Sequence, residues 1–496
     1  MASASGVVAA PKFPTAPNMA SLLVMSRRKK GHPARKPVSL RPQTSPRSGT
    51  RVVFLCFLIG MAATVGVVRY LPQLAKLHRD YDPHHTAAKE PMSLYSADAA
   101  MRHVEQIAKE PRWTGSKALD RSLDYVSREI ESMVAAAESN GMLLEVESFT
   151  SNGSFPCSTG LTKVVISYSN VLSIVARISP IELSGQEIDS RREGYDPEQT
   201  LLVNAHVDSG LGSPGANDNV VGVGVALESL RCIASLSQAA NRLSRPIVFL
   251  FNGAEEPLLA GAHGFVTSHR WAQGIAAHIN LESIGAGDSY HLFQMGPRNA
   301  WLAHAYAKAV RSPSGTAGSS DIFELGLIPA ETDFRIFKEF GIPGYDFALV
   351  GNGHVYHTVY DDVKHVSMDA LVYGGKVLLL PLAMELAGRD DAIGRHRKQL
   401  KAPKPALSLT GIDSRVVYFD VLHVFIFAYS HEIGLLVSCM AMLLWAVVWG
   451  RQTSATLRHT TSTSKLKMRM LLVLLGCLVS MAASGLGYAM YSCPYP

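Results

Sequence analysis

The stretch "LLVNAHVDSGLGSPGANDN" (201–219) decides the fold, because an apolar run ends there in two polar side chains and a Gly/Pro/Ser loop. The run predicts a buried strand. Side chains alternate along a strand, so His206 and Asp208 point the same way. A carboxylate in this position can hold the second ring nitrogen of a metal-binding imidazole. Asp218 follows the loop, where a helix is expected to start, although each residue alone also fits an ordinary strand end or helix start.

Apolar strands alternate with helices on both sides of this stretch. Helical spacing marks 93–110 and 117–139, and strand patterns mark 142–150 and 170–179, with a polar loop between the two strands. Further along, the predicted strands are 200–207, 246–252, 276–282, 290–296 and 345–350, and the predicted helices are 220–236, 258–272, 299–310, 333–340 and 367–388. Continuous apolar strands separated by helices predict an α/β domain over 90–395, with a mixed, mostly parallel central sheet flanked by helices.

Three further strand ends carry acids or imidazoles. The stretches "FLFNGAEEP", "HINLES" and "GHVYHTVYDD" supply, in this order, Glu255, Glu256, Glu282 and His357. Ligands of open sheets collect beyond the carboxyl ends of the strands, so these side chains are expected to meet those of the opening stretch. Two imidazoles with several carboxylates suit zinc, whereas an all-oxygen set would suit magnesium or calcium. Five ligands with one shared carboxylate make two zinc positions, and a sixth carboxylate remains as a base.

Three apolar segments are predicted to span a membrane: 52–69, 421–450 and 470–491. The segments 1–51 and 451–469 are basic and contain no acid. The positive-inside rule places both in the cytoplasm, as a tail and a loop, and the large domain on the lumenal side. Membrane lipid, through three spans, is therefore an expected partner.

The basic, Pro/Ser-rich tail is predicted to be disordered, and the first span to be a retained signal-anchor rather than a cleaved signal peptide. Because the spans explain the basic residues, no nucleic-acid partner is expected. Residues 396–420 are predicted to link the domain to the second span. Asn152 lies in an Asn-Gly-Ser sequon and would carry a glycan on the lumenal side. Cys157 and Cys232 are the only cysteines of the large domain, and whether they pair stays open.

The motifs "AHVDS", "SPGANDN", "LFNGAEE", "INLES" and "YHTVYDD", in this order, resemble those of the family 28 zinc aminopeptidases. The flanking "HGF", "TDFRI", "IPG" and "YFDVL" are similar to those of its membrane branch, the endoplasmic reticulum metallopeptidases. The resemblance covers about 90–430 and implies the zinc-aminopeptidase fold, peptide substrates and the endoplasmic reticulum membrane, with a lumenal catalytic domain. The membrane branch usually carries further spans, so the full number of spans stays open, as does the oligomeric state.

Carried over by position, the resemblance implies two Zn2+ ions per chain. The implied ligands are His206 and Glu282 for one ion, Glu256 and His357 for the other, and Asp218 as the bridge between them. Asp208 would orient His206. Glu255 would be the general base, which takes a proton from the bridging water and passes it to the leaving amine. Asp333, in "TDFRI", would either contact substrate or be an acid at a helix start.

The leading hypothesis is a membrane-anchored di-zinc exopeptidase of the aminopeptidase type, which hydrolyses peptide bonds at peptide N-termini. Two alternatives stay open. A glutaminyl-cyclase-like aminoacyltransferase would use the same scaffold with one zinc, so zinc content distinguishes it. A non-catalytic receptor or scaffold would keep the fold without turnover, and a Glu255→Gln chain that performed equally in the cell would favour it.

Overall fold

The computed structural model describes residues 89–159, 162–181, 199–237, 241–297, 300–325, 331–388, 392–393, 395 and 416–457. Every described residue belongs to one compact unit of the chain, which lies within 67–496. The predicted tail 1–51, signal-anchor 52–69 and third span 470–491 lie outside the described residues.

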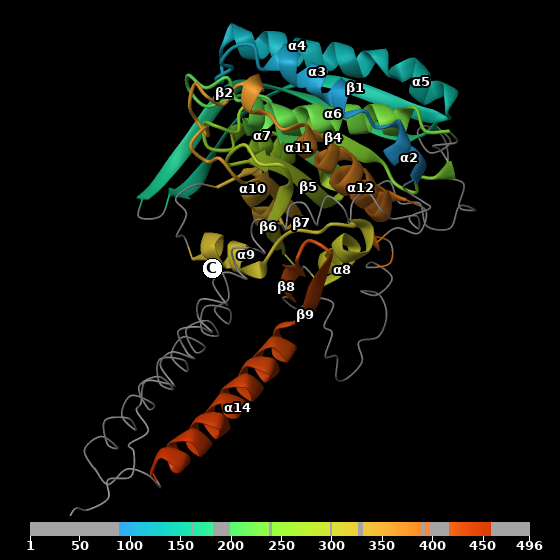
Figure 1. Cartoon of the computed structure of the whole chain (residues 1–496). Helices are drawn as coiled ribbons and strands as arrows, with labels where there is room; N and C mark the ends of the chain where they lie inside the picture. Colours follow the sequence, from blue (N-terminus) through green and yellow to red (C-terminus); the bar gives the residue numbers. More distant parts are fainter. Residues whose placement is uncertain are drawn as a thin grey trace, which may run out of the picture. The chain divides into compact units, whose positions relative to one another are not determined.

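A seven-stranded mixed sheet runs through the domain in the order β1-β2-β4-β3-β5-β7-β6 (Figure 1). Its strands are β1 (Met142–Thr159), β2 (Thr162–Pro180), β3 (Thr200–His206), β4 (Ile247–Asn252), β5 (Ile275–Ser283), β6 (Tyr290–Gly296) and β7 (Gly344–Leu349). The central neighbours β4, β3, β5 and β7 are parallel, and the outer strands join them antiparallel. The prediction of an α/β fold with a mixed sheet and a parallel centre is therefore confirmed.

Helices cover both faces of this sheet. They are α2 (Lys89–Leu94), α3 (Ala97–Ile107), α4 (Lys117–Ser132), α5 (Val134–Ser139), α6 (Gly222–Ala234), α7 (Ala260–Ser268), α8 (Ala300–Ala309), α9 (Ala317–Glu324), α10 (Asp333–Glu339), α11 (Met368–Val372) and α12 (Leu380–Ala387). Short helical turns are η2 (Ala216–Val221), η4 (Ala272–Gly274), η5 (Val363–His365) and η6 (Tyr373–Leu379). The serines before α3 and α4 cap them, since the side chains of Ser96 and Ser116 accept the N–H groups of Ala99 and Leu119 at 3.1 Å.

Alternation along the strands gives the sheet two separate cores. Leu201 and Val203 of β3 pack into a large core with α6 and α12, whereas Leu202 packs into a smaller core with α7 and α10. His206 shares the face of Leu202, because the two residues differ by an even number of positions. The imidazole therefore points to the α7 and α10 side of the sheet.

The predicted polar loop between residues 150 and 170 is wrong. β1 and β2 pair as far as Thr159 and Thr162, and the outer part of this ribbon stays ordered because Phe155 packs into the smaller core. The sequon residue Asn152 is exposed on β1, beside a register irregularity. Cys157 and Cys232 are both free buried thiols. They cannot meet, because they belong to the two separate cores.

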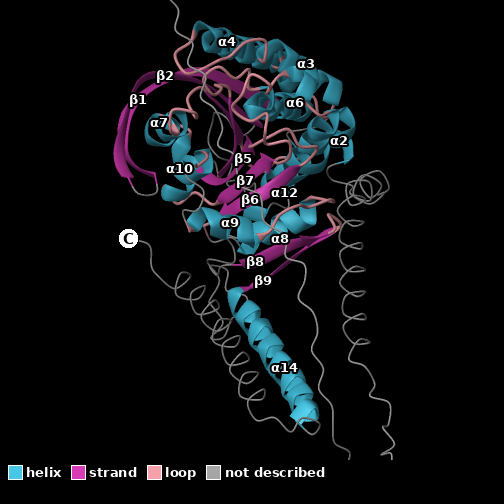
Figure 2. Cartoon of the chain, turned by 60° about the vertical axis from the view of Figure 1, so that its left-hand side comes forward, coloured by secondary structure: helices cyan, strands magenta, loops and turns pink. Residues whose placement is uncertain are grey.

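Residues 416–457 form a β-hairpin followed by a long helix (Figure 2). The hairpin consists of β8 (Val416–Val421) and β9 (Phe425–Ser430), and the helix α14 is His431–Leu457. Three predicted boundaries differ from this. The linker 396–420 ends in a strand, the second span 421–450 is helical only from His431, and the helix continues to Leu457, into the predicted loop 451–469. The strand was not predicted because both faces of β9 carry apolar residues, so its sequence does not alternate between apolar and polar residues.

One helical stretch within the described residues, Met368–Ala387, is long and apolar enough to cross a bilayer. Most of it, 78% of its apolar window, is buried inside the domain, where α11, η6 and α12 pack on the sheet. The apolar part of α14, His431–Val447, is shorter. The three predicted spans therefore stay a prediction.

Candidate metal centre

Three predicted ligands from three elements meet at the carboxyl edge of the sheet. His206 ends β3, Glu282 lies near the end of β5, and Asp218 lies in η2. His206 Nε2 is 3.2 Å from Asp218 Oδ1 and 3.2 Å from Glu282 Oε1. One ligand atom from each of the three side chains lies within 4.8 Å of the others, as a metal-binding group requires.

A second group of this kind shares the same aspartate. His357 Nε2 is 3.1 Å from Asp218 Oδ2 and 3.2 Å from Glu256 Oε2. Glu256 follows β4 and His357 follows β7. The four ligands other than Asp218 therefore lie at or just beyond the ends of the parallel strands β3, β4, β5 and β7. The two oxygens of Asp218 face different imidazoles, which is the arrangement of a carboxylate that bridges two ions.

The chemistry of these side chains fits a pair of zinc ions. Glu256 Oε1 and Glu282 Oε2 are buried without a hydrogen-bond partner among the described residues. A buried carboxylate oxygen without a partner is costly, and a cation would compensate it. The set of two imidazoles with oxygen ligands is one that zinc prefers. No metal ion is part of the structure.

Asp208 contacts residues of both ligand groups, through its main-chain carbonyl and through its carboxylate. His206 Nδ1 lies 3.0 Å from the Asp208 main-chain oxygen and 3.4 Å from its carboxylate, so the carbonyl is the nearer partner. The carboxylate accepts the N–H groups of Glu255 and Glu256, both at 3.1 Å, and the Thr114 hydroxyl at 3.0 Å. The same residue therefore orients the imidazole and holds the turn that carries two acids.

Glu255 lies half-buried beside the two ligand groups, and its carboxylate makes no hydrogen bond within the described residues. Burial raises the pKa of Glu255 well above its ordinary value, and the neighbouring Glu282 and Asp333 raise it further. For His357, hydrogen bonds to Asp218 and Glu256 raise the pKa to about 10. A raised pKa makes a carboxylate a stronger base.

Two supporting residues were missed in the sequence. Asp361 is fully buried and accepts the Asn217 N–H at 2.8 Å and the Asp218 N–H at 3.1 Å, so it holds the loop that presents the shared aspartate. Arg112 is also fully buried, and its guanidinium donates to the carbonyls of Val207 at 3.0 Å and Gly215 at 3.2 Å. The first acid of "YDD" was the only signal for Asp361, and nothing local marked Arg112.

The backbone at His357 is unusual for a non-glycine residue, with φ of 56°. Such a left-handed conformation costs energy and persists where the surroundings hold it. Gly210 lies against this residue, since a Cβ there would be 3.1 Å from His357 Cδ2 and 3.3 Å from Glu256 Oε1. The glycine loop of the opening stretch thus leaves room for the second ligand group.

A layer of buried polar side chains lies next to the ligands, two residues earlier along β3 and β5. Asn204 and Asn280 precede His206 and Glu282 by two residues and therefore share their face. Asn204 Nδ2 donates to Asp333 Oδ2 at 2.9 Å, and Asn280 Nδ2 donates to Asp346 Oδ1 at 2.8 Å. Asp333 is the first residue of α10, as one of the two interpretations of this residue predicted. In the interior of the domain, its carboxylate accepts hydrogen bonds from side-chain amides.

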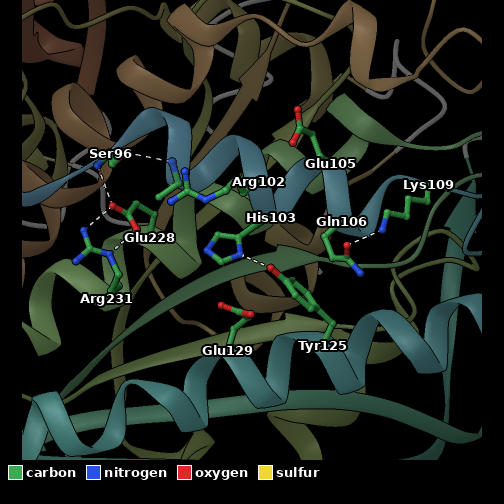
Figure 3. Close-up of a pocket in the computed structure, with 11 residues that line it drawn as sticks. Ser96, Arg102, His103, Glu105, Gln106, Lys109, Tyr125, Glu129, Glu228 and Arg231 are labelled. Atoms are coloured by element: carbon green, nitrogen blue, oxygen red, sulfur yellow. Dashed lines mark hydrogen bonds and ion pairs between the residues drawn. The ribbon is translucent and has the colours of Figure 1, made fainter.

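A separate cavity of about 800 Å³ lies among α3, α4 and α6 (Figure 3). None of the seven predicted site residues lines it. Its polar side chains pair with one another: His103 Nδ1 lies 2.7 Å from the Tyr125 hydroxyl, and Arg231 pairs with the buried Glu228 at 2.6 Å. The metal centre therefore does not depend on this cavity.

Known proteins share this sequence pattern. Residues 188–380 match peptidase family M28, a range that contains all seven predicted site residues. The human endoplasmic reticulum metallopeptidase 1 is 34% identical over 348 residues, which cover 69% of this chain and 34% of that protein. The vacuolar membrane protease of Schizosaccharomyces japonicus is 30% identical over 270 residues, which cover 54% of this chain and 29% of that protein. The chain spans about a third of the length of the curated relatives it matches.

Among solved structures, the aminopeptidase from Aneurinibacillus sp. strain AM-1 is 14% identical with a TM-score of 0.45, and the match covers 61% of this chain and 96% of that chain. The strand order above, and not this likeness, defines the fold.

An α/β sheet with two carboxylate–imidazole groups at its carboxyl edge defines a metallohydrolase type of domain. The sequence match identifies the family within this class. The chain belongs to peptidase family M28, a family of metallopeptidases, and the resemblance noted in its motifs is confirmed.

Proposed function

We propose that the chain is a membrane-anchored di-zinc exopeptidase that hydrolyses peptide bonds at the N-termini of peptides. The observation that carries this proposal is the pair of ligand groups that share Asp218. A single-zinc cyclase-like site would need only one of them. The names of the mammalian relatives support residence in the endoplasmic reticulum membrane, and the basic segments 1–51 and 451–469 support a lumenal catalytic domain.

The ligand assignment follows the two groups. His206 and Glu282 would hold one zinc ion, Glu256 and His357 the other, and Asp218 both. When bound, the zinc pair would polarise the scissile carbonyl and lower the pKa of a bound water.

Glu255 acts as the general base in this proposal. Its carboxylate makes no hydrogen bond among the described residues, and burial raises its pKa, which favours acceptance of a proton. It takes a proton from the attacking water and delivers it to the nitrogen of the leaving amine. Asp208 keeps the base in position, because the carboxylate of Asp208 binds the backbone of the turn that carries Glu255.

The test compares Glu255→Gln with Glu138→Gln in the full chain, purified in lipid nanodiscs. Glu138 is exposed on α5 and is a matched control. We expect Glu138→Gln to release free amino acid from short peptides, to lose this activity on chelation and to regain it with zinc. Glu255→Gln should keep two zinc ions per chain and lose about 10²–10⁴-fold in rate.

Three outcomes would contradict the proposal. Equal rates for the two variants would exclude Glu255 as the base. One zinc per chain, with cyclisation of N-terminal glutamine, would favour the aminoacyltransferase. Two zinc ions without turnover of any tested peptide by the unaltered chain would favour a receptor or scaffold.

A further inference from the structure

The β8–β9 hairpin alternates its side chains between the domain and the outside. The pairs Tyr418–Ala428 and Phe419–Phe427 are neighbours in the register, so their side chains lie on opposite faces. Tyr418 is 1% exposed, whereas Phe427 is 49% exposed. The hairpin therefore has an inner face on the domain and an outer face.

The inner face fixes the hairpin to the domain through polar contacts. Asp420 Oδ2 accepts the Gly315 N–H at 3.1 Å, and the Asp420 N–H donates to the Gly315 carbonyl at 3.0 Å. The Tyr418 hydroxyl lies 3.1 Å from Ser320 Oγ. Because these partners precede and begin α9, the hairpin cannot tilt independently of the domain.

The outer face is apolar over its whole length. It consists of Val417, Phe419, Val421, Phe425, Phe427 and Tyr429. The exposed fractions of Phe419, Phe425 and Phe427 are 37%, 45% and 49%. Their rings form one patch, with 5.5 Å between the centroids of Phe419 and Phe427 and 5.1 Å between those of Phe425 and Phe427.

The outer face departs from the usual pattern of a covered antiparallel pair. Such a pair normally turns apolar residues to the core and polar residues to water. Here the inner face packs Val416 and Ile426 into the large core as expected, but the outer face carries phenylalanines where polar residues would be usual. An exposed aromatic patch of this kind marks an interaction surface.

The apolar surface continues into α14. Gly434 lies against Tyr429 and Val417, since a Cβ there would be 3.2 and 3.5 Å from them. The helix then exposes apolar side chains, which are Leu436, Val437, Met440, Leu443, Leu444, Trp445 and Val447. Figures 1 and 2 both show the hairpin between α8 and α9 on one side and the start of α14 on the other.

We propose that the outer face of the hairpin lies in the headgroup region of the membrane and fixes the orientation of the peptidase domain over the bilayer. This inference rests on the proposed membrane anchoring. Surfaces that lie in the plane of the membrane bury phenylalanine and other apolar side chains at the boundary between headgroups and acyl chains. Glu432, exposed in the first turn of α14, marks the level at which the helix meets water. The patch lies at this level because β9 runs directly into the helix.

The experiment places a photoreactive p-benzoylphenylalanine in the full chain, in membranes that contain alkyne-tagged phosphatidylcholine. One variant replaces Phe427. The control replaces Phe340, which is also 49% exposed but follows α10. After irradiation, lipid adducts are quantified by mass spectrometry. We expect at least about tenfold more lipid adduct at position 427 than at position 340.

Equal lipid yields at the two positions would overturn the inference. So would an adduct of position 427 with a second copy of the chain or with another protein in place of lipid. Carbonate extraction of the same membranes separates the two proposals. A chain that is extracted overturns both the anchoring and the hairpin contact, whereas a retained chain without lipid adduct at position 427 overturns the hairpin contact alone.

Discussion

Replacing Asp361 by asparagine tests how the shared aspartate is held in place. The Asp361 carboxylate accepts the Asn217 N–H and the Asn217 Nδ2, both at 2.8 Å, and the Asp218 N–H at 3.1 Å. An asparagine keeps one accepting oxygen and turns an NH2 group toward a backbone donor. At least one charge-assisted hydrogen bond is then lost, which is worth about 1.5–3 kcal/mol. Since the lost bond positions a metal ligand, we expect about 10–100-fold weaker zinc binding.

The assay is competition for zinc between the full chain and a fluorescent chelator. Asp362→Asn is the matched control, because Asp362 is the neighbouring acid, is only partly buried, and accepts the Lys364 N–H at 3.0 Å instead of the N–H groups of Asn217 and Asp218. The melting temperature of the zinc-free chains separates loop placement from unfolding. Zinc affinity of Asp361→Asn within twofold of Asp362→Asn would refute the role of this carboxylate.

Two further predictions concern stability. Gly253→Ala should destabilise the domain by about 1–3 kcal/mol, because its Cβ would lie 2.1 Å from the Leu172 carbonyl oxygen, whereas Gly318→Ala meets only Thr316 Oγ1 at 3.8 Å. A lower melting temperature for Gly318→Ala than for Gly253→Ala would contradict this prediction. Burial lowers the pKa of His278 from 6.5 to about 3, so the unfolded chain binds a proton that the folded chain excludes, and stability is lost as the pH falls through this window. His278→Leu should remove up to about 1.4 kcal/mol per pH unit from the slope of unfolding free energy below pH 6.5, measured by chemical unfolding at several pH values; a slope identical to that of the unaltered chain would exclude this imidazole as the cause.

The parallel centre of the sheet could be predicted because each strand is a short apolar run between turn residues. "TLLVNAHV" and "PIVFLFN" are examples, and β3 and β4 lie within a residue or two of them. The convergence of the seven side chains at one edge of the sheet could be predicted for a related reason. Parallel strands bring their carboxyl ends to one edge, so acids and imidazoles that end strands converge.

What escaped prediction depends on contacts between distant segments. Arg112 binds carbonyls about a hundred residues away, such as those of Val207 and Gly215, and no local pattern encodes such partners. For the outer ribbon of β1 and β2 the sequence predicts a loop, because most of its residues are polar and only a few, such as Phe155 and Cys157, pack into a core. The β8–β9 hairpin was not predicted from the sequence. Both faces of β9 carry apolar residues, and such a continuous apolar run is also typical of the start of a membrane helix.

The most direct test of a shared-aspartate centre is a crystal of the zinc-loaded chain measured on both sides of the zinc absorption edge. The anomalous difference map should contain two peaks, one between His206 and Glu282 and one between Glu256 and His357, with Asp218 between them. A single peak, or peaks away from these side chains, would contradict the paired centre.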